Sequence, residues 1–145
     1  QLGLLHLTLR HLGTIDRLKD MGVQDYLIAN TLNLSVAQRL VRLLCKSCRA
    51  QSTDRLEFPN ESLHEITHFR SMGCEKCYFT GFQGRIALFE MLEIDREVSD
   101  IIKNDPGSIY RHLSNKGFKT IKDQAKELIK SGKTSFEEAY PLLIE

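Results

Sequence analysis

Two Cys-x-x-Cys pairs constrain this chain more than any other feature of its 145 residues. Cys45 and Cys48 form the first pair, Cys74 and Cys77 form the second, and 25 residues lie between the pairs. A two-residue gap lets one turn direct both thiolates of a pair toward one ion, and zinc prefers four ligands in a tetrahedron. The spacing predicts a structural zinc site, because four thiolates leave no open coordination position.

A disulfide framework, a redox centre and four unrelated thiols are the alternatives. The sequence shows no signal-peptide pattern, which favours a reducing compartment, where such pairs more often bind metal. A redox centre needs one pair, and neither pair follows the strand-to-helix pattern of a thioredoxin-like site. Gly73 and Gly81 permit a tight backbone around the second pair. Phe79 and Phe82 are expected to pack over the sulfurs and shield them.

The overall charge argues against a nucleic-acid binder. The chain is 41% hydrophobic and 27% charged, which is a globular balance, and its formal net charge is only +1. Acidic residues also surround the thiols, namely Glu57, Glu61, Glu65 and Glu75. No apolar run reaches the roughly 18 residues of a membrane span.

Hydrophobic spacing predicts the following elements. Leu12, Ile15 and Leu18 indicate a helix that ends at Gly22. A short helix between the cysteine pairs could be capped by Asn60 or Ser62, and Ser62 with Glu65 fits the spacing of a capping box. The remaining elements are a strand at 2–9, a long helix at 24–44, a strand at 84–94, and four short helices in a bundle at 95–145.

Two short motifs imitate enzyme signatures. "HEITH" matches the zinc-protease pattern, with His64 and His68 on one helical face and Glu65 as the base. Its glycine-containing extension is missing, and Glu90 as a third ligand falls in a predicted scaffold strand. Two solvent-facing histidines on a short helix are therefore the preferred interpretation.

"SGKTS" at 131–135 imitates the end of a phosphate-binding loop. The full motif requires a glycine where Glu127 stands, and a strand before it rather than a predicted helix. The preferred interpretation is that a helix ends at Gly132. A new helix then starts with a capping box, made by Thr134 with Glu137 or by Ser135 with Glu138.

Several motifs in order resemble the C-terminal region of the secretion ATPases of type II secretion and type IV pilus assembly. These motifs are "AQRLVR" before the first cysteine pair, "GCEKCYFTGFQGR" around the second, "EML" after it, and "KTSFEEA" near the end. The resemblance covers about residues 12–145.

The resemblance implies an α/β fold in three parts. Residues 1–44 would end a RecA-like P-loop domain, 45–94 would form the four-cysteine zinc module with its following strand, and 95–145 would form a helical subdomain. Cys45, Cys48, Cys74 and Cys77 would hold the zinc. Arg85 would lie near the subunit interface and the nucleotide. Arg39 and Arg42 are further candidates for this role, and the alternative for both is a solvated helix face.

The resemblance also implies partners and a location. Members form hexameric rings in the cytoplasm, peripheral to the inner membrane, and use ATP and Mg to move an inner-membrane platform protein. We expect this chain to be a C-terminal fragment whose partners are neighbouring subunits and that platform, with no direct nucleic-acid contact. The chain lacks the phosphate-binding loop, so we expect no ATP hydrolysis by it alone.

Two expectations concern the first residues. The family's histidine box transfers to neither His6 nor His11, because neither lies at the expected distance from Gly13 and Arg17. The apolar segment with Leu4, Leu5 and Leu7 is expected to seek partners by dimerisation or strand exchange. The alternative function is a free-standing zinc ribbon that binds nucleic acid or protein, and the metalloprotease is a third.

Overall fold

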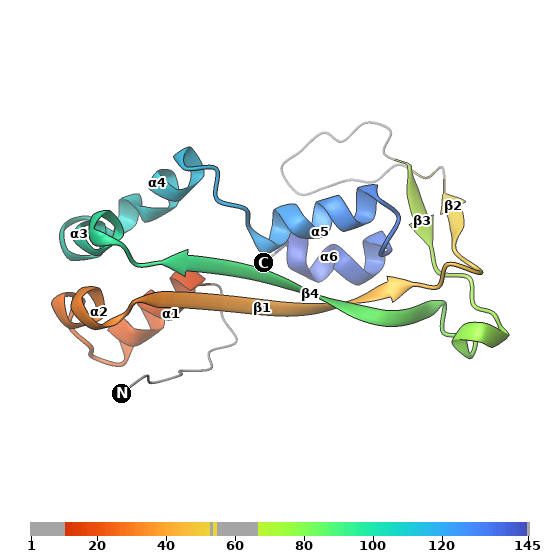
Figure 1. Ribbon diagram of the computed structural model, residues 1–145, viewed down its shortest axis with the longest axis horizontal. Helices are drawn as coiled ribbons and strands as arrows, with labels where there is room; N and C mark the ends of the chain where they lie inside the picture. Colours follow the sequence, from red (N-terminus) through yellow and green to blue (C-terminus); the bar gives the residue numbers. More distant parts are fainter. Residues whose placement is uncertain (1–10, 53, 55–66, 145) are drawn as a thin grey trace. The chain divides into compact units, whose positions relative to one another are not determined.

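The computed structural model describes residues 11–52, 54 and 67–144. Its longest elements are two strands, β1 (Leu34–Leu44) and β4 (Phe82–Glu93), which pair with each other and run in opposite directions (Figure 1). The chain forms two compact units, and both strands contribute to each. Of the described residues, unit 1 contains those up to Gln38 together with Phe89–Lys119, and unit 2 contains those of Arg39–Leu88 and those from Thr120 onward.

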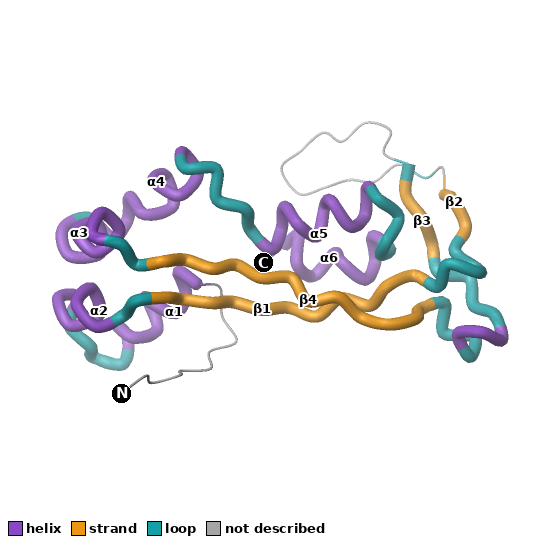
Figure 2. Tube along the Cα trace, viewed as in Figure 1, coloured by secondary structure: helices purple, strands orange, loops and turns teal. Residues whose placement is uncertain are grey.

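Unit 1 consists of helices packed with residues 34–38 of β1 and residues 89–93 of β4. Its helices are α1 (His11–Asp20), α2 (Asp25–Thr31), α3 (Arg96–Asn104) and α4 (Ile109–Asn115), the last preceded by a short 3-10 turn, η2 (Pro106–Ser108) (Figure 2). Helix α2 packs against α3. Ile28, Val98 and Ile102 are almost fully buried in this core. The Ser99 hydroxyl donates a 2.9 Å hydrogen bond to the Ala29 carbonyl and ties the two helices together.

The helix predicted from Leu12, Ile15 and Leu18 is confirmed as α1. Gly22 follows it with a φ of 84°, and its amide donates to the Lys19 carbonyl at 2.8 Å. The amide of Val23 donates to the Leu18 carbonyl, which completes a Schellman-type helix end.

The long helix predicted at 24–44 is wrong. The helix stops at Thr31, and residues 34–44 form strand β1. Ala37 and Val41 are buried on one side of β1, but Leu34, Val36 and Leu40 are apolar and exposed on the other. Apolar residues on both sides of the strand concealed its two-residue period. Pairing with β4 then outweighs the helix propensity of the Ala, Gln, Arg and Leu residues in this segment.

Unit 2 contains residues 39–44 of β1 and 82–88 of β4, a pair of short strands and two helices. Strands β2 (Ala50–Ser52) and β3 (His68–Arg70) pair antiparallel, with Gln51 opposite Phe69. A 3-10 turn, η1 (Glu75–Cys77), precedes β4. Helices α5 (Ile121–Lys130) and α6 (Phe136–Ile144) pack against each other. Ile129 and Leu143 are fully buried.

The strand predicted at 84–94 and the four helices predicted after it are confirmed. The single bundle predicted for those helices is not found, because α3 and α4 belong to unit 1, and α5 and α6 belong to unit 2. The division into segments 1–44, 45–94 and 95–145 follows sequence motifs and stays a prediction, whereas each compact unit combines separated segments. The predicted strand at 2–9 and the capping box of Ser62 and Glu65 lie outside the described residues.

Among the described residues, no helix has both the length and the apolar character needed to span a membrane.

Candidate metal centre

The four cysteine thiols converge on one point at the end of unit 2. All four sulfurs lie within 4.8 Å of one another. The Sγ–Sγ distance is 3.9 Å for Cys45 and Cys74, and 3.8 Å both for Cys48 with Cys77 and for Cys74 with Cys77. A tetrahedron with metal–sulfur bonds of about 2.3 Å has edges of about 3.8 Å, so the spacing fits a tetrahedral thiolate site. The same distances are far too long for disulfide bonds, and all four cysteines are free.

Two tight turns hold the sulfurs in place. In the first turn, the amides of Cys48 and Arg49 both donate to the Cys45 carbonyl, at 3.3 and 2.9 Å. In the second turn, the amides of Cys77 and Phe79 donate to the Cys74 carbonyl, at 3.1 and 2.9 Å. These repeated bonds to one carbonyl bend the chain so that both thiols of each pair point inward.

Glycines permit this backbone, as the sequence predicted. Gly73 and Gly81 have φ values of 94° and 77°. A Cβ on Gly73 would lie 2.7 Å from the Phe79 carbonyl oxygen, and one on Gly81 would lie 2.5 Å from Cβ of Ser71. The Cys45 amide donates to the Gly81 carbonyl at 2.9 Å, which joins the two turns.

Hydrogen bonds within the cluster favour the thiolate form of Cys77. Burial raises the pKa of Cys77, but amides of Cys74 and Gly81 donate to its sulfur at 3.2 and 3.3 Å and lower that pKa to about 6. Burial and the neighbouring thiols raise the pKa of Cys48 to about 12. Closely spaced thiols cannot all ionise without a compensating cation. The donor set therefore suits a divalent metal that binds soft sulfur ligands, such as zinc.

Cys45 and Cys77 are buried, and Cys48 and Cys74 are partly exposed. With four sulfur ligands the site would be closed, so a metal here would hold the loops together and would have no position for substrate.

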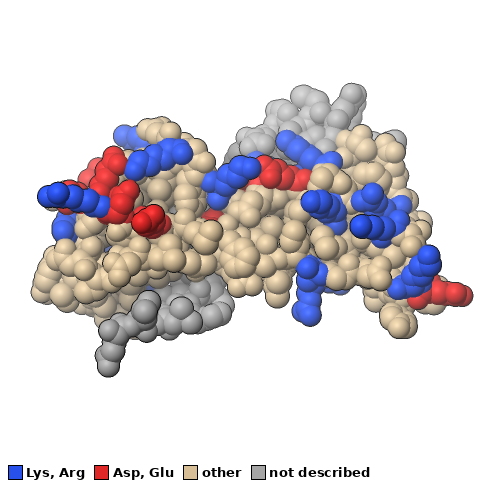
Figure 3. Space-filling view, in the orientation of Figure 1, with Lys and Arg blue, Asp and Glu red and all other residues tan. Residues whose placement is uncertain are grey.

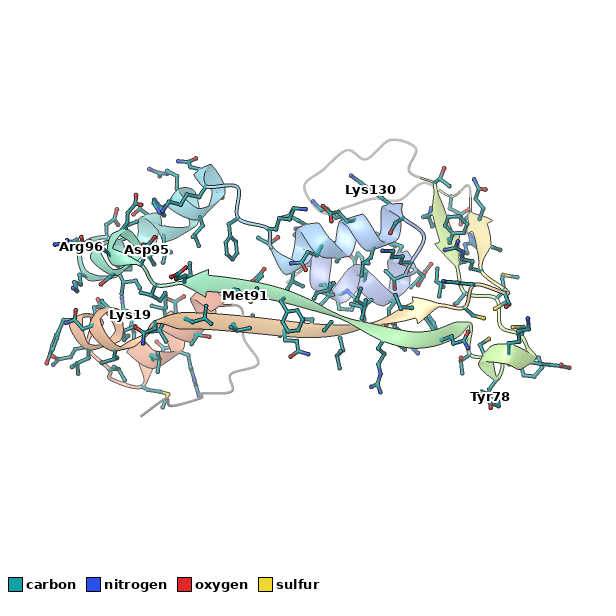
Figure 4. The ribbon with its side chains drawn as sticks, in the orientation of Figure 1. Lys19, Tyr78, Met91, Asp95, Arg96 and Lys130 are labelled. Atoms are coloured by element: carbon teal, nitrogen blue, oxygen red, sulfur yellow. The ribbon has the colours of Figure 1, made fainter. Side chains whose placement is uncertain are left out.

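The prediction that Phe79 packs over the sulfurs is wrong. Phe79 is 74% exposed, with a backbone φ of 60°, so it does not shield the sulfurs from solvent. Tyr78, also at positive φ (53°), is 88% exposed and points outward in Figure 4. Phe82 is half-buried and lies under the Arg42 guanidinium, whose central carbon is 4.2 Å from the ring centroid.

Arg49, just after the first cysteine pair, makes contacts with Phe69 and Gly132 that the sequence did not predict. Its guanidinium lies 4.9 Å from the Phe69 ring centroid and donates to the Gly132 carbonyl at 2.5 Å. Gly132 in turn lies so close to Phe69 that a Cβ there would be 2.4 Å from the ring. Arg49 thereby links the cysteine loops to the turn before α6, a contact between segments distant in sequence that no local pattern predicts.

The two described residues of the "HEITH" segment, Thr67 and His68, are not helical. Thr67 has no regular secondary structure, and His68 lies on strand β3. His68 is 1% exposed, so the expectation that it faces solvent on a helix is wrong; pairing of β3 with β2 places it inside. His64 and Glu65 lie outside the described residues. Glu90 is buried on β4, the strand predicted to be scaffold.

The "SGKTS" segment is a helix–helix turn and not a phosphate loop. Helix α5 ends before Gly132, as predicted, with a φ of 63° at the glycine. The Glu138 amide donates to the Ser135 hydroxyl at 3.3 Å, so Ser135 caps α6. The fully buried Thr134 instead donates its hydroxyl to the Arg42 carbonyl at 2.8 Å. These hydroxyls serve the fold and do not face an open cradle.

The three candidate arginines all lie on the long strands in unit 2. Arg39 is partly exposed on β1, and Arg85 is exposed on β4. Arg42 is committed to a second element, because its guanidinium donates to a Glu138 carboxylate oxygen at 2.6 and 3.0 Å. Its backbone amide donates to the other oxygen of the same carboxylate at 3.1 Å. These donors outweigh the effect of burial and lower the pKa of Glu138.

Sequence comparison relates the chain to known secretion proteins. The family profile described as "Type II/IV secretion system protein" matches residues 2–140. The chain is 36% identical to a protein transport protein HofB homolog of Escherichia coli, over 90% of this chain and 29% of the relative. It is 32% identical to the type II secretion system ATPase E of Vibrio cholerae, over 87% of this chain and 26% of the relative.

A type IV pilus ATPase is a further relative, and one solved structure shares the fold. Identity to the type IV pilus assembly ATPase PilB of Acinetobacter baylyi is 33%, over 86% of this chain and 23% of the relative. The X-ray structure of the Legionella pneumophila ATPase DotB matches 92% of this chain and 29% of its own, with a TM-score of 0.52 at 19% identity. That likeness concerns the fold alone. The chain spans less than a third of the length of each of these proteins.

Proposed function

Because this chain belongs to the type II/IV secretion ATPase family, we propose that it serves as the C-terminal part of an ATPase that powers type II secretion or type IV pilus assembly. The parent would act as a hexameric ring in the cytoplasm, against the inner membrane, with ATP and Mg bound in a RecA-like domain. The proposal draws support from a match that covers nearly the whole chain and less than a third of each relative.

We propose further that Cys45, Cys48, Cys74 and Cys77 hold one structural zinc ion. The observation that carries this is the set of four sulfurs within 4.8 Å of one another, at the spacing of a tetrahedral thiolate site. In the described part of the segment from Cys45 to Cys77, the buried apolar residues are the two cysteines Cys45 and Cys77 themselves, so metal binding would supply much of its folding free energy.

In this proposal the chain contributes contacts and not chemistry. Arg85 and Arg39 would face nucleotide or the next subunit. Arg42 has a smaller part, because Glu138 already engages its guanidinium. The cysteine loops and α5–α6 would contact neighbouring subunits and the membrane platform protein.

Metal analysis of the purified chain tests the zinc proposal. We expect one zinc per chain without added metal, and four thiols that react with a thiol reagent only after denaturation. Cys74→Ser should lose the zinc, whereas Ser71→Ala, on an exposed neighbour, should keep it. Zinc-free protein with reactive thiols would contradict the proposal.

Turnover and complementation test the role in the parent ATPase. The isolated chain should show no Mg-dependent ATP hydrolysis. Supplied within the longer protein, the chain should support hydrolysis, and Cys74→Ser in that protein should abolish it together with the bound zinc. Robust ATP turnover by the isolated chain would contradict the assignment.

A free-standing zinc ribbon that binds protein or nucleic acid is the second candidate, because the same four thiols would serve it equally well. Steep salt-dependent binding to DNA would favour it. The metalloprotease receives no support, because His68 lies on a strand.

A further inference from the structure

The four sulfurs of the cysteine site differ in how far the protein shields them from solvent. Cys45 and Cys77 are buried. Cys48 and Cys74 are partly exposed, and the neighbouring Phe79, itself 74% exposed, does not cover the site. A small oxidant in solution can therefore reach the sulfurs of Cys48 and Cys74.

Backbone amides distinguish Cys74 from the other exposed cysteine. The Gly73 amide donates to the Cys48 sulfur and favours its thiolate form. The Cys77 sulfur accepts from two amides, those of Cys74 and Gly81. Within the described part of the chain, no amide donates to the Cys74 sulfur. An amide that donates to a thiolate lowers its nucleophilicity, so Cys74 is the exposed sulfur that keeps the most.

The surroundings of the two turns are mostly basic. Lys46 lies within the first Cys-x-x-Cys pair, Lys76 lies within the second, and both are exposed. Exposed Arg49 adds a positive charge, and exposed Glu75 adds a negative one. On the side drawn in Figure 3, the charged side chains at the end of unit 2 that bears β2 and β3 are mostly Lys and Arg. Partly exposed, electropositive surroundings are typical of reactive cysteines.

We propose that Cys74 is an oxidative modification site that reacts with hydrogen peroxide or an organic hydroperoxide, and that Cys77 then forms a disulfide with it. With hydrogen peroxide, the Cys74 thiolate attacks one oxygen, the O–O bond breaks, and a sulfenic acid and hydroxide result. The Cys77 thiolate then attacks the Cys74 sulfur, the S–O bond breaks, and a second hydroxide leaves. The two sulfurs together lose two electrons, and the peroxide gains them.

The geometry favours Cys77 as the second cysteine. Its sulfur lies 3.8 Å from that of Cys74 and belongs to the same turn, so the bond length of about 2 Å is reached within that turn. The Cys45 sulfur is 3.9 Å away, but it belongs to the other turn. A disulfide with Cys45 would therefore require the two turns to move toward each other.

The disulfide would take two of the four sulfur ligands from the metal site. Structural zinc sites use four ligands, so the remaining pair should hold the ion weakly. This inference rests on the proposed zinc site and adds a regulation of it, in which peroxide releases the metal and loosens the cysteine loops. A dithiol reductant with added zinc should restore the site, because a disulfide is a reversible form of oxidised cysteine.

Peroxide treatment of the zinc-loaded chain tests the proposal. Zinc should be released to a chromogenic chelator, and a dithiol reductant with added zinc should reverse the release. At early times a dione reagent specific for sulfenic acids should label Cys74 before any other cysteine. Peptide mass spectrometry of the final product should find Cys74 joined to Cys77. First labelling of another cysteine, or a different disulfide, would overturn the proposal.

Two histidine variants sharpen the test. Cys74→His and Cys48→His each leave three cysteines and one histidine, a ligand set that structural zinc sites use. The Cys48 variant keeps the reactive thiolate, so peroxide should release zinc about tenfold or more slowly from the Cys74 variant than from it. Equal rates would contradict the assignment to Cys74. The labelling experiment uses the wild-type chain, so it decides the question even if one variant binds no zinc.

Zinc content before peroxide is added separates this inference from the proposed function. A chain that holds one zinc and keeps it in peroxide would refute the oxidation site and leave the metal site standing. A chain that contains no zinc at the start would refute both.

Discussion

At the residue scale, the cysteine loops depend on positions where only glycine fits. Gly81 needs a left-handed backbone and also lacks the space for a side chain, because Ser71 lies against it. Gly22 has the same kind of backbone, with a φ of 84°, but nothing lies within 4 Å of its missing Cβ. Comparing substitutions at Gly81 and Gly22 therefore distinguishes the cost of steric crowding from the cost of backbone strain.

We therefore predict that Gly81→Ala lowers the free energy of unfolding by about 3 kcal/mol and reduces zinc occupancy. Gly22→Ala should cost about 1 kcal/mol, the strain of a left-handed alanine alone, and leave zinc unchanged. Thermal unfolding and metal analysis of both variants measure this. Equal losses in the two would show that crowding against Ser71 is unimportant.

The ion pair of Arg42 and Glu138 gives a pH-dependent residue effect. The pKa of Glu138 is lowered in the folded chain, so its contribution to stability is complete above the ordinary glutamate pKa of about 4.3 and is lost as the pH falls through the lowered value. We predict that Glu138→Gln costs about 1 kcal/mol at neutral pH and progressively less in acid. Urea unfolding at several pH values tests this, and a cost that does not change with pH would contradict it.

At the element scale, hydrogen bonds join the turn between α5 and α6 to the end of β1. The Leu44 amide donates to the Lys133 carbonyl at 2.8 Å, and the Thr134 hydroxyl donates to the Arg42 carbonyl. Arg49 adds its bond to the Gly132 carbonyl. Three successive residues of the turn thus contact the strand and the cysteine loop that follows it.

Thr134→Val keeps the side-chain shape and removes the buried hydroxyl. We predict a loss of about 1–2 kcal/mol in the free energy of unfolding, because the Arg42 carbonyl loses its donor. Thr31→Val is the control, since the Thr31 hydroxyl also donates to a backbone carbonyl, that of Leu27, but at an exposed site. Its cost should stay within about 0.5 kcal/mol. Denaturant unfolding of the two variants measures both costs, and equal costs would show that the buried hydrogen bond from Thr134 to Arg42 contributes little to stability.

At the scale of the whole molecule, the metal site and the helices α1–α4 belong to different compact units. If the four cysteines hold zinc as proposed, a chelator should affect the two units unequally. We predict that removing the ion raises amide hydrogen exchange in β2, β3 and η1 and leaves the protection of α2 and α3 largely intact. Exchange measured by mass spectrometry with and without chelator tests this. Equal loss of protection in α2 and α3 would show that the two units unfold as one.

The sequence by itself determined which four cysteines come together, the glycines that permit their turns, the strand after them, helix α1 and the four helices that follow the strand. These features depend on residue type and short spacing, and local backbone preference is enough to specify them. The sequence also predicted the family, because several motifs of that family occur in order along the chain.

Only the tertiary structure decided the rest. Residues 34–44 become a strand because β4 pairs with them, although their local pattern favours a helix. Tyr78 and Phe79 face solvent because hydrogen bonds and the close packing at Gly73 hold their backbone at positive φ. The four predicted C-terminal helices are divided between two compact units because each pair meets a different stretch of the long strands. Each outcome depends on contacts between residues far apart in the sequence, whose free energies exceed the local preferences that a pattern records.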